Sequence, residues 1–174
     1  PDGGSTTRSV ETPVINDLYI LAFQATGEYV NNVPQEPYLY YVRAEKNGSD
    51  QSWTATLKST DYTQTFVMLA NVENQTNAAG DDSDDLSKQL YKALTTAAGK
   101  NKADVLKDLY VSVDGRIDKS SDLPLTGQTE GIIRSDQGTQ TLKVSLYRMV
   151  AGVNVYTNSL GGSELKGFAM QEVS

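Results

Sequence analysis

The chain contains no cysteine and no histidine among its 174 residues. Without cysteine it forms no disulfide, which excludes an extracellular scaffold held together by disulfides. The absence of both residues also excludes Ser–His–Asp and Cys–His catalytic sites and His-ligated zinc sites within this chain. No run approaches the roughly 18 apolar residues of a membrane-spanning helix.

Positive charge is scarce. Lys and Arg total 15 against 22 Asp and Glu, which gives a formal net charge of −7. Because binding to phosphate needs Lys and Arg, we expect no nucleic-acid partner and no attraction to anionic membranes. No glycine-rich phosphate loop is present, since residues 160–163 lack the Lys and the helix that would follow, and we expect no cofactor.

An enzyme that uses paired carboxylates is the catalytic class that remains, because glycoside hydrolysis needs two acids across a cleft. Nothing in the sequence singles out such a pair, so we expect a non-enzyme. The acidic run 80–85 (GDDSDD) has no EF-hand spacing, because its Gly comes first and no Glu closes it. A solvated helix N-terminus explains this run better than a calcium site does.

Ten tyrosines and several alternating apolar runs indicate a mainly β protein. Residues 86–97 instead have apolar side chains at helical spacing, Gly99 fits the helix end, and a second short helix is expected at 102–109. The sequence therefore predicts a two-sheet antiparallel β-sandwich of about seven strands with a short helical insertion. The expected strands are 14–23, 38–43, 53–57, 65–72, 110–113, 130–134 and 141–156.

The stretch 142–155 (LKVSLYRMVAGVNV) is the most informative. Its apolar residues alternate in two runs, and the phase changes at Arg148, so we expect a bulge or bend near Arg148 or Gly152. Upstream, 122–127 read DLPLTG. This segment matches the sortase signature, but it is internal and a strand follows. We interpret it as a turn in which Pro124 fixes φ and Gly127 takes a positive φ.

These segments, together with 17–23 (DLYILAF), resemble the fimbrillin family of type V pilus subunits in their order. The family has an early apolar strand, then a Pro-hydrophobic-Thr/Ser-Gly turn, then a strand around an Arg-x-Val-Ala core. In this chain the matching residues are Pro124, Gly127, Arg148, Val150 and Ala151, to which we assign structural roles. Gly152 departs from the pattern, since the family often has a basic residue there.

The resemblance implies a transthyretin-like sandwich and a division into a flexible leader (1–13), an N-terminal sandwich domain (14–157) and a linker with the possible first strand of a second domain (158–174). Fimbrillins have two such domains. The chain begins with Pro, not Met, and carries no signal peptide, which indicates a processed or truncated product.

The resemblance also implies a function. Fimbrillins are exported as lipoproteins and matured by an Arg-specific protease that cuts ahead of the first strand, and Arg8 is the candidate here; the alternative is an ordinary Arg in a flexible tail. Removal of the preceding segment opens a groove that a strand of the next subunit fills. The expected partners are other fimbrial subunits, the protease and an unknown surface ligand, on a fimbrium attached to the outer membrane.

The alternative to a structural subunit is a surface module that binds carbohydrate or protein. Its working residues would be exposed aromatics, with Trp53 and the group Tyr38, Tyr40 and Tyr41 as candidates. We expect Trp53 to belong to the core instead, because it alternates in phase with Ala55 and Leu57.

Overall fold

A computed structural model describes residues 13–48, 52–73, 86–107, 109 and 123–149. Several features expected from the sequence lie outside these residues: Arg8, the strand 110–113, Val150, Ala151 and the segment 158–174. Neither helix among the described residues is long and apolar enough to cross a bilayer.

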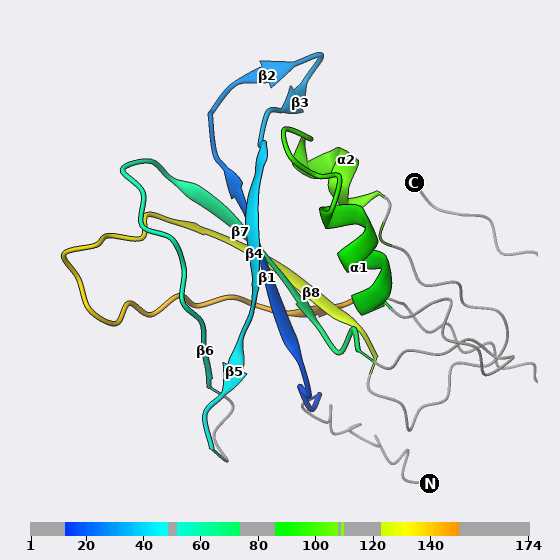
Figure 1. Ribbon diagram of the computed structural model, residues 1–174, viewed down its shortest axis with the longest axis vertical. Helices are drawn as coiled ribbons and strands as arrows, with labels where there is room; N and C mark the ends of the chain where they lie inside the picture. The colour runs from blue at the N-terminus through cyan, green and yellow to red at the C-terminus, as the bar shows by residue number, and fades with distance from the viewer. Residues whose placement is uncertain (1–12, 49–51, 74–85, 108, 110–122, 150–174) are drawn as a thin grey trace, which may run out of the picture.

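A five-stranded antiparallel sheet forms the centre of the molecule, with the order β4-β1-β7-β8-β9. Its middle strand, β7, is buried along its whole length, which confirms the central strand expected at 65–72. Two short hairpins, β2–β3 and β5–β6, extend from the sheet (Figure 1). The strands are β1 (Leu18–Gln24), β2 (Tyr29–Val30), β3 (Val33–Pro34), β4 (Tyr38–Arg43), β5 (Glu45–Lys46), β6 (Trp53–Thr54), β7 (Gln64–Ala70), β8 (Leu125–Gly131) and β9 (Tyr147–Arg148).

One face of the sheet is covered by the helices α1 (Leu86–Leu94) and α2 (Lys102–Leu106), shown in green in Figure 1. Leu90, Leu94 and Val105 pack there against Leu21 and Phe23 of β1. Each buried aliphatic side chain in such a layer stabilises the fold by about 1.5–3 kcal/mol. The helical insertion expected from the 86–97 spacing is confirmed, and it covers this face.

The opposite face is covered by extended chain. Trp53, Ala55 and Leu57 pack against the buried side chains of this face, and so do Leu142, Val144 and Leu146. Both segments alternate between partly buried and exposed residues, as strands over a core do. The mainly β, antiparallel architecture is confirmed, and two layers around a common core are consistent with a sandwich.

Three expected elements differ in the structure. The strand expected at 130–134 lies earlier in the chain, because β8 ends at Gly131. The turn expected at 122–127 is wrong: β8 begins at Leu125, and Gly127 lies inside this strand without a positive φ. The strand expected at 141–156 enters the sheet, among the described residues, only at Tyr147 and Arg148. Leu146 packs on one face of the sheet and Met149 on the other, as residues three positions apart in a regular strand do. The change in the apolar pattern therefore moves the apolar side chains from one face to the other, and the described pairing of β9 with β8 contains no bulge.

Candidate functional site

The candidate site is residues 141–146, which we call the covering segment. Leu142, Val144 and Leu146 point into the core, while Thr141, Lys143 and Ser145 are exposed. This alternation has a period of two, and the apolar positions give the segment its place over the sheet. The covering segment therefore has the side-chain pattern of a strand.

Both ends of the covering segment are fixed. On its C-terminal side, β9 pairs with Leu125 and Thr126 of β8, and the Met149 amide donates to the Pro124 carbonyl at 2.9 Å. On its N-terminal side, the Gln140 side chain accepts from the Arg134 amide at 3.0 Å and donates to the Ile132 carbonyl at 3.4 Å. The segment is thus held across β8 by contacts at each end.

Gly127 lets the covering segment approach β8 closely. A Cβ at this position would lie 2.3 Å from the Ser145 carbonyl oxygen and 2.9 Å from Cδ2 of Leu146. Real Cβ atoms do not approach other atoms this closely, so any side chain here would displace the segment. Glycine inside a strand often marks such a close backbone approach.

The backbone of the covering segment makes no hydrogen bond with any other residue that the structure describes. The outer edge of β8 is similar, because β9 pairs only with its first two residues and Gly127–Gly131 has no described strand on that side. Amide and carbonyl groups in extended chain are strong bonding groups and a template for pairing with another strand. This region can therefore accept a strand.

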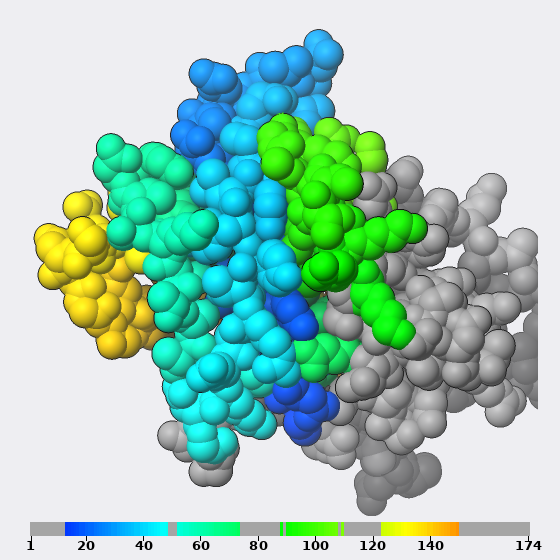
Figure 2. Space-filling model, viewed as in Figure 1, coloured from blue at the N-terminus to red at the C-terminus, as the bar shows by residue number. Residues whose placement is uncertain are grey.

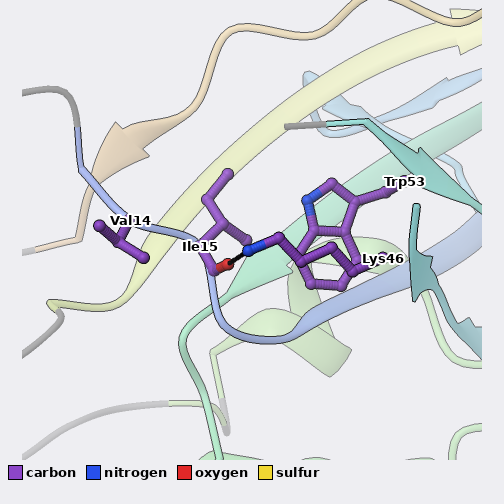
Figure 3. A pocket seen from close by; sticks show the side chains of 4 residues that line it. All are labelled: Val14, Ile15, Lys46 and Trp53. Carbon is purple, nitrogen blue, oxygen red and sulfur yellow. Dashed lines mark hydrogen bonds between the residues drawn. The ribbon is translucent and has the colours of Figure 1, made fainter. Parts of the chain in front are cut away.

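Trp53 lines a small cavity with Val14, Ile15 and Lys46 (Figure 3). The Lys46 ammonium lies 6.0 Å from the centroid of the Trp53 ring and donates to the Ile15 carbonyl at 3.5 Å. The cavity, at about 20 Å³, has room for about one water molecule and not for a sugar ring. Trp53 is partly buried against the core beside Ala55 and Leu57, as expected.

The three tyrosines considered for ligand binding do not form a common surface. Tyr40 is buried and donates a hydrogen bond to Gln64 at 3.0 Å, whereas Tyr38 packs edge-on against Phe23 on the opposite face. A register shift between β1 and β4 separates the two orientations. The hypothesis of a ligand surface made of all three tyrosines is therefore wrong.

A charged cluster fixes the ends of β1 and β7. Arg43 makes a two-pronged ion pair with Glu73, at 2.7 and 3.1 Å, and Tyr19 donates to the same carboxylate at 2.6 Å. The hydrogen bond from Arg43 holds the pKa of Glu73 below its usual value, and burial raises the pKa of Tyr19 to about 12. Burial also raises the pKa of Asp17, whose carboxylate accepts from the Val72 and Glu73 amides. These groups satisfy one another, which indicates a structural role.

The structure brings together the motif residues that it describes. Pro124 and Gly127 lie at the start of β8, and Arg148 pairs with Leu125 beside them, with an exposed side chain. Sequence reasoning expected a strand at 141–156 but missed that the backbone of 141–146 pairs with no other described residue. The alternation of apolar residues indicates burial of side chains and carries no information about ladder partners.

Among the described residues, no group of acidic side chains is arranged to hold a metal ion. A family model described as "Fimbrillin-A associated anchor proteins Mfa1 and Mfa2" matches residues 2–172. No curated protein and no solved structure matches the chain. Because the family match covers nearly the whole sequence and agrees with the resemblance to fimbrillins, this chain belongs to the family of fimbrillin-A associated anchor proteins Mfa1 and Mfa2.

Proposed function

We propose that this chain is a structural subunit of a bacterial surface fimbrium and joins other subunits by strand addition at the covering segment. Membership of a family of fimbria-associated anchor proteins supports a role at the cell surface. The covering segment is the observation that supports joining by strand addition. Its apolar side chains pack against the core, and its backbone has no hydrogen-bond partner among the described residues.

Strand addition fits this region physically. A partner strand placed beside the covering segment would satisfy its amides and carbonyls and would also set alternate side chains over the same core. Main-chain hydrogen bonds supply affinity that depends little on sequence, and apolar contacts supply specificity. Such a joint is long-lived because dissociation breaks the whole ladder together.

Proline substitution tests this proposal. Successive amides of extended chain point to opposite sides, so Lys143→Pro removes a donor from one edge of the covering segment and Val144→Pro removes one from the other edge. The matched controls Lys143→Thr and Val144→Thr keep the donors and favour extended chain. The full-length variants are mixed with fimbriae purified from the cells that make this protein, and bound protein is measured after washing.

We expect one proline variant to lose binding to the fimbriae while its threonine control binds as the wild type does. Circular dichroism of each free variant shows that it is folded. If both folded proline variants bind as well as their controls, the covering segment is not the acceptor and the proposal fails.

Maturation, attachment and adhesion extend this proposal. In this extension, a lipidated precursor is attached to the outer membrane, and an Arg-specific protease cuts it after Arg8. The cut would present the sandwich domain 14–157 to neighbouring subunits. The assembled subunits would then contribute to adhesion. Mass spectrometry of the native protein tests the cut, because a mature chain would then begin at Ser9. An intact native sequence through Arg8 would remove maturation from the proposal and leave strand addition in place.

A further inference from the structure

The β2–β3 hairpin carries apolar side chains that the described part of the fold leaves exposed. Three of the seven large apolar side chains exposed within the described residues lie on it: Tyr29 is 68% exposed, Val30 56% and Val33 41%. None of the three packs against either core cluster. Figures 1 and 2 show the hairpin projecting at one end of the long axis of the molecule.

The hairpin is preorganised. Asn31 and Asn32 both have positive φ angles, 51° and 64°, which is the conformation of the tight turn that matches strand twist. Tyr29 pairs with Pro34 and Val30 with Val33, so each face of the hairpin carries one apolar pair. A preorganised element loses little conformational entropy when it docks, which favours binding.

The base of the hairpin is fixed to the rest of the fold. The Gln35 amide donates to the Glu28 carbonyl at 2.8 Å, and the Thr26 hydroxyl donates to the Gln35 carbonyl at 2.5 Å. The Asn101 side chain, at the start of α2, donates to the Pro34 carbonyl at 2.9 Å and accepts from the Glu36 amide at 2.7 Å. The hairpin therefore projects from a rigid base.

The chemistry of the hairpin selects a protein partner. Residues 29–35 carry no charge, and the exposed Glu28 precedes them, so nucleic acid and anionic surfaces are unsuitable ligands. Entry into a bilayer would begin with the two asparagines at the tip, whose polar groups find no partner in hydrocarbon. A protein partner could instead offer a slot with apolar walls and polar groups at its floor. The walls would contact the apolar side chains of the hairpin, and the floor would bind the two asparagine amides at its tip.

The hairpin is too small to form a stable interface by itself. A stable protein interface uses about 20–30 residues a side, far more than this hairpin offers. The hairpin therefore acts as one anchor within a larger contact. We infer that the β2–β3 hairpin inserts into an apolar slot of the neighbouring fimbrial subunit and adds a second contact to the strand joint, an inference that rests on the proposed function.

Tyr29→Ser tests this inference, with Tyr91→Ser as its matched control because Tyr91 is 67% exposed on α1. A second variant, Val30→Thr with Val33→Thr, keeps the β-branched shape and the turn while removing apolar surface. Each full-length protein is titrated onto fimbriae purified from the producing cells. We expect both hairpin variants to bind at least about tenfold more weakly, and Tyr91→Ser to bind as the wild type does.

A photoreactive phenylalanine analogue in place of Val33 identifies what the hairpin touches, and mass spectrometry of the cross-link should show a fimbrial subunit. Wild-type affinity in both folded hairpin variants, while a proline variant of the covering segment loses binding, would overturn this inference and leave the proposed function standing. Failure of the wild type to bind fimbriae would overturn both. Hairpin-dependent binding to phosphatidylcholine vesicles, with no cross-linked subunit, would overturn the inference in favour of a bilayer.

Discussion

Gly127 connects the sequence motif 122–127 to the packing of the covering segment. Its missing side chain leaves the space in which the Ser145 carbonyl and the Leu146 side chain approach β8. The sequence identified this glycine but assigned it to a turn. The role as a close-approach residue could not be predicted, because it depends on a segment some twenty residues further along the chain.

Gly127→Ala should destabilise the fold by about 1–3 kcal/mol, because the added methyl group collides with backbone and forces the covering segment away from the core. Gly138→Ala is the matched control, since a Cβ there meets no atom within 4 Å. The control should change stability by less than about 0.5 kcal/mol. Chemical denaturation followed by Trp53 fluorescence measures both, and equal stabilities would contradict the packing described for Gly127.

Two partly buried tyrosines make the stability depend on pH in the alkaline range. Burial raises the pKa of both Tyr19 and Tyr38 to about 12, whereas an unfolded tyrosine titrates near 10. The folded state then holds more protons than the unfolded state, so the free energy of unfolding is unaffected below pH 10 and falls between pH 10 and 12. The double variant Tyr19→Phe with Tyr38→Phe should show a shallower fall than the wild type in thermal melts. The same slope in both proteins would contradict this assignment.

For other residues, the local sequence pattern predicted the environment of the side chain in some cases and not in others. Trp53 was predicted to pack on the core because its phase matches Ala55 and Leu57, and the structure agrees. Arg148, where the apolar pattern changes phase, is exposed in β9. Tyr40 was grouped with Tyr38 and Tyr41 as a ligand surface. That grouping failed because the shifted register of β1 and β4 sends Tyr38 and Tyr40 to opposite faces.

At the scale of elements, α2 is joined to the sheet by a partly buried ion pair. The Lys102 ammonium lies 2.5 Å from the Glu36 carboxylate and also donates to Gln128 of β8 at 3.0 Å. Glu36 accepts in addition from the Thr65 hydroxyl of β7 at 2.6 Å. Because these groups have little access to solvent, each depends on the others for its hydrogen bonds.

Lys102→Met should cost about 3 kcal/mol of stability, because it leaves the Glu36 carboxylate buried without its cation. Lys107→Met is the matched control at the other end of the same helix, where both side chains of the ion pair with Asp104 are exposed. The control should lose no more than about 0.5 kcal/mol, as exposed ion pairs contribute little. Urea denaturation measures the stability of both variants. Similar losses of stability would contradict a larger contribution from the buried ion pair.

Elements with strong periodicity could be predicted, and short ones could not. The apolar run at 65–72 and the helical spacing at 86–97 correspond to β7 and α1. The β2–β3 hairpin was missed, although Asn31-Asn32 between apolar residues is a signal for its turn. Strands as short as Tyr29–Val30 have too few residues to show alternation, and the nearby prolines favoured an irregular turn.

For the whole molecule, composition and pattern predicted a mainly β fold with a helical insertion, but not the strand order or the layer that covers each face. Helices cover one face of the sheet and extended chain covers the other. The order β4-β1-β7-β8-β9 depends on pairings between distant segments, such as Leu18 with Ala70, which a single sequence does not reveal. The covering segment's lack of a backbone partner among the described residues depends on the same arrangement, and the sequence did not reveal it either.

Hydrogen exchange of the covering segment is the most direct test of strand addition at this site. Backbone amides of residues 141–146 are followed by mass spectrometry in the free chain and in the chain bound to purified fimbriae, with β7 amides as the internal reference. A strand added by another subunit would slow exchange in the covering segment by orders of magnitude, while β7 stays protected in both states. Equally fast exchange of residues 141–146 in the free and bound chains, with β7 still protected, would contradict strand addition at this site.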